Sequence, residues 1–149
     1  MEIMFQPIAR GNFRDVVRLK VAPEQDDFVA PNLYSIAEAF VEPTWTPLAM
    51  YAHEALVGFA MFGYDDETDR WWIIRFMIGA AHQGKGLGAA ALSALVALMA
   101  ERHGCRAIHL GYVPGNAIAE RLYARIGFIA TGEIEDGEIV ARLDLPMRV

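Results

Sequence analysis

The chain has one cysteine, Cys105, in 149 residues, so it cannot form an internal disulfide. A chain of this kind fits a reducing compartment, and we expect a cytoplasmic protein. Cys105 lies in no nucleophile motif, which favours a structural thiol over a catalytic one. Long hydrophobic runs are missing too: the longest uncharged stretch, 86–100, has 15 residues, fewer than the ~20 of a membrane span. The first ten residues show no signal-peptide pattern, so we expect no membrane association.

Positive charge is also scarce. The net charge is −6, which disfavours proteins that bind nucleic acids through the phosphate backbone. No Lys or Arg lies between Lys20 and Arg70, whereas the same stretch contains ten acidic residues. This acidic stretch is either an ordinary solvated surface or a source of field that attracts cationic substrates. His and Cys residues form no cluster that predicts a metal site, so we expect no metal.

Hydrophobic residues are plentiful, at 54% of the total, which is enough for one folded domain over residues 1–149. Apolar patterns and turn residues predict strands at 3–8, 48–53, 56–64, 71–78, 107–112, 128–135 and 138–145. They also predict helices at 12–20, 32–41 and 86–103, and a fourth that follows the turn 114–116 and ends at 126. This order predicts a mixed α/β fold: a mostly antiparallel sheet flanked by helices, with a central strand–helix–strand crossover.

Three local features accompany these elements. Asn12 is the expected N-cap of the first helix, and residues 21–32 read as a loop because they contain two prolines. Glu54-Ala55 and Asp136-Gly137 are the expected hairpin turns, and only the second carries the favoured Asp-Gly signal.

The segment 75–91 carries the strongest functional signal. An apolar strand is followed by Gly84, Gly86 and Gly88 and then by an uncharged helix. The free N–H groups and the dipole at a helix N-terminus favour anions, and glycine lets the backbone approach them closely. The segment therefore predicts a phosphate-binding site.

Several phosphate-binding patterns fit parts of this segment. Residues 79–85 match the start of a P-loop, but Gly86 supplies no hydroxyl for Mg²⁺. Residues 86–91 match a Rossmann variant, but several strands precede them and no acid follows the next strand where the ribose would need one. A purely structural tight turn also stays open. The remaining pattern is Gln-x-x-Gly-x-Gly, which begins at Gln83.

The pattern at Gln83 occurs together with two others in a fixed order. Val57-Gly58-Phe59 precedes it, and Asn116 to Phe128, with its N…A…LY…GF pattern, follows it. Over nearly its whole length the chain resembles the GNAT family of acyl-CoA-dependent N-acetyltransferases. Within that family it is most similar to the spermine/spermidine (diamine) acetyltransferase branch. That narrower likeness lies in segments 57–62, 75–78, 83–88 and Gly132-Glu133…Gly137-Glu138.

The resemblance implies a cofactor site for acetyl-CoA. Backbone N–H groups of the loop and first helical turn would bind the diphosphate: Gln83, Gly84, Lys85, Gly86, Leu87, Gly88 and Ala89. The pantetheine would pair with the main chain of Phe76, Met77 and Ile78 like an added strand, and an N–H group there would stabilise the oxyanion. Lys85 either adds charge or is an ordinary loop lysine. Asn116 contacts the cofactor, caps its helix, or does both.

The resemblance also implies catalytic roles. Tyr123 matches the family tyrosine that protonates the departing thiolate, although a packed helix aromatic is the plain alternative. The general base is open: Glu38 is the first choice, and Glu24, Glu42 and Glu133 are weaker ones. Glu24, Tyr34, Glu38 and Trp72 are the candidates for the acceptor side.

The expected reaction is direct transfer of an acetyl group from acetyl-CoA to a primary amine, without a metal. The acidic stretch favours a small polyamine such as spermidine or spermine as the acceptor. A peptide or protein N-terminus, an amine antibiotic, and a non-catalytic acyl-CoA-binding module are the alternatives. Edge strands at 128–145 predict a homodimer.

Overall fold

One seven-stranded sheet organises residues 2–147, which the computed structural model describes. In chain order the elements are β1 (Ile3–Pro7), α1 (Phe13–Arg18), η1 (Pro23–Phe28), α2 (Asn32–Val41), β2 (Trp45–Ala52), β3 (Ala55–Asp65), β4 (Arg70–Ile78), η2 (Ala80–His82), α3 (Leu87–His103), β5 (Ala107–Tyr112), α4 (Ala117–Ile126), β6 (Ile129–Glu135) and β7 (Glu138–Asp144). The predicted order of strands and α-helices and the predicted mixed α/β class are confirmed. No helix within residues 2–147 has the length and apolar character needed to cross a bilayer.

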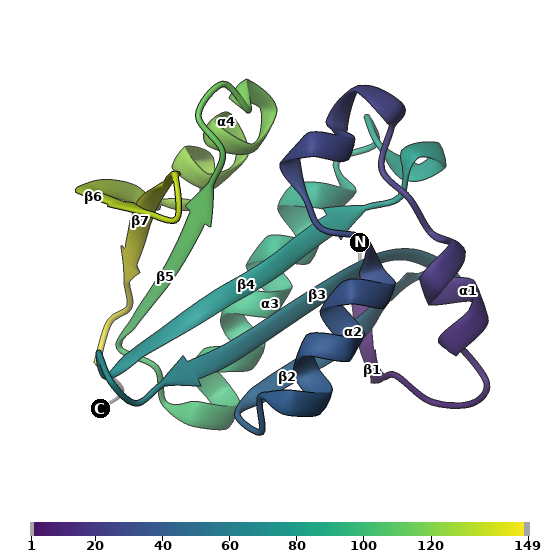
Figure 1. Cartoon of the computed structure of the whole chain (residues 1–149), viewed down its shortest axis with the longest axis horizontal. Coiled ribbons are helices and arrows are strands. Elements are labelled where there is room, and N and C mark those ends of the chain that lie inside the picture. Colours follow the sequence, from purple (N-terminus) through teal and green to yellow (C-terminus); the bar gives the residue numbers. More distant parts are fainter. Residues whose placement is uncertain (1, 148–149) are drawn as a thin grey trace.

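The strand order in the sheet is β1-β2-β3-β4-β5-β7-β6. Every neighbouring pair is antiparallel except β4 and β5, which are parallel. Parallel neighbours require a crossover connection, and α3 supplies it. The sheet therefore has the one central strand–helix–strand crossover that the sequence predicts, as Figure 1 shows.

β4 contains a β-bulge at Ile74. Met61 and Phe62 of β3 pair with the residues on either side of Ile74, which has no partner itself. A bulge bends its strand and increases the local twist. The ladder between β4 and β5 ends beside the bulge, at the pair Ile73 and Leu110. The bulge thus accounts for the separation of β4 from β5, which Figure 1 shows as two diverging strands.

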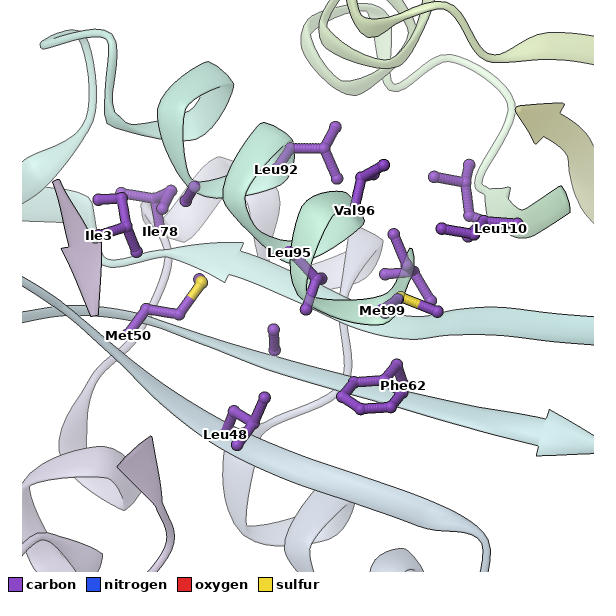
Figure 2. Packing of buried hydrophobic residues seen from close by; sticks show 14 of the residues in the cluster. Ile3, Leu48, Met50, Phe62, Ile78, Leu92, Leu95, Val96, Met99 and Leu110 are labelled. Atoms are coloured by element: carbon purple, nitrogen blue, oxygen red, sulfur yellow. The ribbon is translucent and has the colours of Figure 1, made fainter. Parts of the chain in front are cut away.

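Helices cover both faces of the sheet. On one face, apolar residues of α3 pack on the central strands, and Figure 2 shows Leu95 of this helix pointing toward them. Leu92, Leu95 and Met99 of α3 are fully buried there. On the other face, α1 and α2 pack over a second cluster that includes Val16 and Phe59. Because β3 lies between two apolar layers, its residues 57–63 are buried without alternation, as in strands covered on both faces.

The structure differs from the sequence predictions at four places. The first hairpin turn is His53-Glu54, not Glu54-Ala55: both residues have positive φ, 49° and 67°, as a two-residue hairpin turn requires. The loop 21–32 contains the 3₁₀ helix η1, and β2 begins at Trp45 instead of residue 48. Asn12 does not cap α1 through its side chain. Its amide instead accepts a hydrogen bond from Ala9 N (2.8 Å) and donates one to the Pro7 carbonyl (2.9 Å).

Gly58 is required by the close approach of β3 to β4. A Cβ atom at this position would lie 2.4 Å from the Met77 carbonyl oxygen and 2.6 Å from Cε of Met50. The side chain of Met50 could move, but the Met77 carbonyl belongs to the sheet and cannot do so without distorting the ladder. The packing of β3 against β4 therefore requires a glycine in the segment Val57-Gly58-Phe59.

We expect Gly58→Ala to lower the free energy of unfolding by about 1–3 kcal/mol through overpacking. Gly11→Ala is the matched control, because a Cβ there meets no heavy atom within 4 Å. Urea denaturation of both variants measures the effect. Equal stability of the two variants would contradict the close approach.

Candidate active site

A cleft of about 810 Å³ opens where β4 and β5 separate. Its walls are residues 73–78 of β4 and residues 110–113 of β5 and the turn that follows. Residues of η1, the loop before α3, α4 and the β6–β7 turn complete the lining. The volume is that of a pocket for a small-molecule ligand.

The glycine-rich loop forms the N-terminal end of α3. Gly84 and Gly86 have φ of 76° and 78°, and no atom lies within 4 Å of a Cβ placed on either. Gly86 is the N-cap of α3, and no side chain caps this helix. The N–H groups of the first turn therefore have no partner within the helix, as at any helix N-terminus. This loop has the backbone geometry and the open space of an anion site.

Gln83 ties this loop to its surroundings. Its side-chain nitrogen donates to the Ile78 carbonyl at the end of β4 (2.9 Å) and to the Gln25 side-chain oxygen in η1 (2.8 Å). A glutamine at this position therefore holds the loop against two walls of the cleft.

Tyr123 lies on α4 and lines the cleft. Its ring packs against Tyr112 and Phe128, with centroid distances of 5.8 and 6.1 Å. Burial, followed by the negative charge of Glu138, raises the pKa of Tyr123 to about 12. Its hydroxyl is therefore protonated at neutral pH and is available as a donor. Asn116 also lines the cleft, and its side-chain oxygen caps α4 by accepting a hydrogen bond from Ala119 N (3.3 Å).

The predicted cofactor residues divide into two groups. The cleft lining includes Phe76, Met77, Ile78, Gln83, Gly84, Gly88, Asn116 and Tyr123. It does not include Lys85, Gly86, Leu87 or Ala89. The side chain of Leu87 is buried in the core, and Lys85 is exposed. Gly86, Leu87 and Ala89 can therefore contact a cofactor only through the backbone, whereas Lys85 can also use its side chain.

Glu38 is part of an ion pair and does not line the cleft. One carboxylate oxygen of Glu38 lies 2.8 Å from a terminal nitrogen of Arg75, and both side chains are largely buried. The other terminal nitrogen of Arg75 donates to the Ile74 carbonyl at 2.9 Å. Arg75 itself lines the cleft. In this arrangement the Glu38 carboxylate already has a cationic partner.

The other predicted acceptor-side residues, and the weaker candidates for the base, also lie outside the cleft lining. Glu24 and Glu42 are exposed, and Tyr34 is 59% exposed. The Trp72 ring packs against His109 at 5.4 Å. Glu133 forms an ion pair with Arg70 at 3.0 Å.

Three acidic residues that received no individual functional role from the sequence line the cleft, Asp27, Asp136 and Glu138. Glu138 is the first residue of β7, directly after the Asp136-Gly137 turn. The hairpin was predictable, but its place beside β5 was not, because β7 pairs with β5 across the intervening α4. The sequence signals for Glu138 were its position after the Asp-Gly turn and its place in the segment Gly137-Glu138 of the narrower family likeness, and neither indicated a catalytic role.

Comparison with known proteins assigns the chain to a family. The profile of the Acetyltransferase (GNAT) family matches residues 13–128. The spermine/spermidine N(1)-acetyltransferase of Bacillus subtilis (strain 168) is 33% identical over 147 residues, covering 94% of this chain and 97% of that protein. The chain belongs to the GNAT acetyltransferase family, as the sequence motifs predicted, and is therefore an acetyltransferase.

Solved structures share the fold at low sequence identity. Spermidine N-acetyltransferase from Vibrio cholerae, in complex with CoA and spermine, has a TM-score of 0.73 and 17% identity and covers 94% of this chain and 92% of its own. Aminoglycoside acetyltransferase AAC(6')-Ib, in complex with coenzyme A, has a TM-score of 0.79 and 16% identity. The match covers 96% of this chain and 95% of that protein's chain. Residues 2–147 contain no group of three or more His, Cys, Asp or Glu side chains that could hold a metal ion.

Cys105 lies outside the cleft lining and is buried. Burial raises the pKa of its thiol to about 11, and its sulfur contacts the Met99 carbonyl at 3.4 Å. On the order of one thiol in a thousand is then ionised at pH 8, so the native protein should react slowly with thiol reagents. Labelling followed by absorbance, with unfolded protein as the rapid control, tests this prediction. Rapid labelling of the native protein would contradict it.

Proposed function

We propose that this chain transfers the acetyl group of acetyl-CoA directly to a primary amine of a polyamine such as spermidine or spermine. The observation that carries the proposal is the cleft between β4 and β5, which joins a glycine-rich helix N-terminus to a partly buried tyrosine. Kinship with a spermine/spermidine N(1)-acetyltransferase supports the choice of acceptor.

The cleft offers matching groups for each part of the cofactor. N–H groups of residues 83–89 would bind the diphosphate, since helix N-termini favour phosphate. Residues 74–78 of β4 have no partner in the β5 ladder, so Phe76, Met77 and Ile78 can pair with the pantetheine amides as a neighbouring strand would. An N–H group of this strand would then face the thioester oxygen and stabilise the oxyanion.

Tyr123 is the proposed acid that protonates the departing sulfur. Its position on the cleft wall and its protonated state at neutral pH support this role. Removing the proton of an aliphatic ammonium also requires an acceptor, because the pKa of such an amine is about 10. Glu38 remains the acceptor that the sequence suggested, and an incoming ammonium would compete with Arg75 for its carboxylate.

The charge of the cleft supports a cationic acceptor. Its lining contains three acidic residues, Asp27, Asp136 and Glu138, and one basic residue, Arg75. An excess of negative charge raises the local concentration of polyamines. Glu24, Tyr34 and Trp72 remain proposals for contacts to the distant part of a long acceptor.

The proposal extends to the context of the enzyme. The chain acts as one acetyltransferase domain in the cytoplasm, without nucleic acid or membrane partners and without a metal. β6 is an edge strand of the sheet with exposed Ile129 and Ile134, which supports a homodimer formed through this edge. Light scattering coupled to gel filtration measures the oligomeric state.

We expect thiol release from acetyl-CoA to be fastest with spermine or spermidine in a panel of amines. Monoamines, an aminoglycoside and a peptide with a free N-terminus complete the panel. Because attraction between exposed charges weakens with salt, KM for the polyamine should rise with ionic strength. A clear preference for a neutral or anionic acceptor would contradict the proposal, and CoA binding without turnover would indicate a binding module.

We expect Tyr123→Phe to lower kcat for the polyamine by about 10²-fold, because a positioned general acid contributes this much. Calorimetry should show CoA affinity close to that of the wild type. Tyr112→Phe is the matched control, since it removes a neighbouring hydroxyl from the same cleft. An undiminished kcat in Tyr123→Phe would refute the acid role.

A further inference from the structure

We propose that Glu138 receives the proton of the acceptor amine and that this transfer prepares Tyr123 to protonate the departing sulfur. The inference deepens the proposed acetyl transfer and rests on it. It assigns the proton acceptor to the β6–β7 hairpin instead of α2.

Gly111 makes room for the Glu138 carboxylate. A Cβ atom at Gly111 would lie 2.7 Å from Oε1 of Glu138 and 3.3 Å from its Cβ. The side chain of Glu138 therefore lies against the bare backbone of β5. Both residues line the cleft, and Gly111 lies in the part of β5 beyond its last pair with β4. The missing side chain at Gly111 and the carboxylate of Glu138 fit one another.

Glu138 lines the cleft and, unlike Glu38 and Glu133, has no cationic partner in the part of the chain that the structure describes. Glu38 is held by Arg75 and Glu133 by Arg70. Within residues 2–147, the Glu138 carboxylate forms no salt bridge. No hydrogen bond is among the causes of the shift in its pKa. An ammonium group that enters the cleft can therefore bind Glu138 without displacing another cation.

The surroundings of Glu138 also make it a better base. Burial raises the pKa of its carboxyl group, the positive charge of Arg75 lowers it, and the negative charges of Asp136 and Glu135 raise it again. The net direction is upward from the ordinary value. A raised pKa reduces the cost of taking a proton from an amine, because the two pKa values lie closer together.

The proton balance of the reaction closes with these two residues. The ammonium gives one proton to Glu138, and the freed lone pair forms the C–N bond while the carbonyl electrons move to oxygen. The C–S bond then breaks as those electrons return, and the sulfur takes the Tyr123 proton to become CoA thiol. The nitrogen gives its second proton to the Tyr123 phenolate, and Glu138 releases its own to solvent. One proton leaves per amide formed.

Protonation of Glu138 also changes Tyr123. A phenol with a pKa of about 12 is a weak acid toward a thiolate, whose pKa is about 8.5. The negative charge of Glu138 is one of the causes of that high pKa. Once Glu138 carries the amine proton, this charge is gone and the pKa of Tyr123 falls. Deprotonation of the nucleophile thus makes the acid stronger at the stage when it is needed, as expected for two coupled sites.

The central test is Glu138→Gln, which keeps size and polarity but cannot accept a proton. We expect kcat for the polyamine to fall about 10²-fold at pH 7, with CoA affinity and melting temperature close to those of the wild type. The acidic limb of the kcat/KM profile should move to higher pH, toward the pKa of the amine, because the variant depends on the amine that is already free in solution. Glu138→Asp should keep the acidic limb with partial activity.

Glu135→Gln is the matched control, since Glu135 lies opposite Glu138 in the same hairpin and outside the cleft lining. It should keep kcat close to that of the wild type and shift the acidic limb only slightly to lower pH, because the charge of Glu135 is the smallest of the causes that act on the pKa of Glu138. Wild-type kcat and an intact acidic limb in Glu138→Gln would overturn the role of Glu138 while acetyl transfer itself stood. Absence of turnover by the wild type with every amine would overturn the proposed function instead.

A spectroscopic test addresses the coupling without turnover. The absorbance of the Tyr123 phenolate is obtained by subtracting the spectrum of the same protein with the additional substitution Tyr123→Phe. The pKa of Tyr123 measured in this way should be lower in Glu138→Gln than in the wild type. The reason is that the variant removes the negative charge that opposes ionisation. An unchanged titration would overturn the coupling between the two residues.

Discussion

The ending of the β4–β5 ladder is the constraint on which the rest of the site depends. A bulge at Ile74 bends β4 immediately after its last pair with β5, so residues 74–78 of β4 continue without that neighbour. The unpaired edge of β4, the N-terminus of α3 and Tyr123 on α4 all face the resulting opening. A fully paired ladder would close the cleft and leave the glycine-rich loop without a channel to the acceptor.

The carboxylates around this opening differ in their partners, and that difference gives the site its chemistry. Arginines neutralise Glu38 and Glu133, whereas Glu138 lies over Gly111 and remains free. A free, half-buried carboxylate that acts on a partly buried phenol forms a pair whose proton affinities depend on one another. Substrate attraction and proton transfer can then use the same negative charge.

Much of the fold could be predicted because its signals are local. Gly104 and Gly127 end α3 and α4 with φ of 63° and 118°, and Asp136-Gly137 forms the last hairpin. The phosphate-binding loop was recognisable for the same reason. The bulge at Ile74 and the place of Glu138 were not, because both follow from pairing between distant strands. Glu38 was the first choice as base on helix position alone, and its pairing with Arg75 depends on how α2 packs over β4.

A crystal structure of the complex with acetyl-CoA tests the central claim most directly. The account predicts the diphosphate on the main-chain N–H groups of residues 83–89 and the pantetheine along residues 76–78, with the thioester sulfur beside Tyr123. A cofactor bound outside the opening between β4 and β5, or a sulfur far from Tyr123, would contradict it.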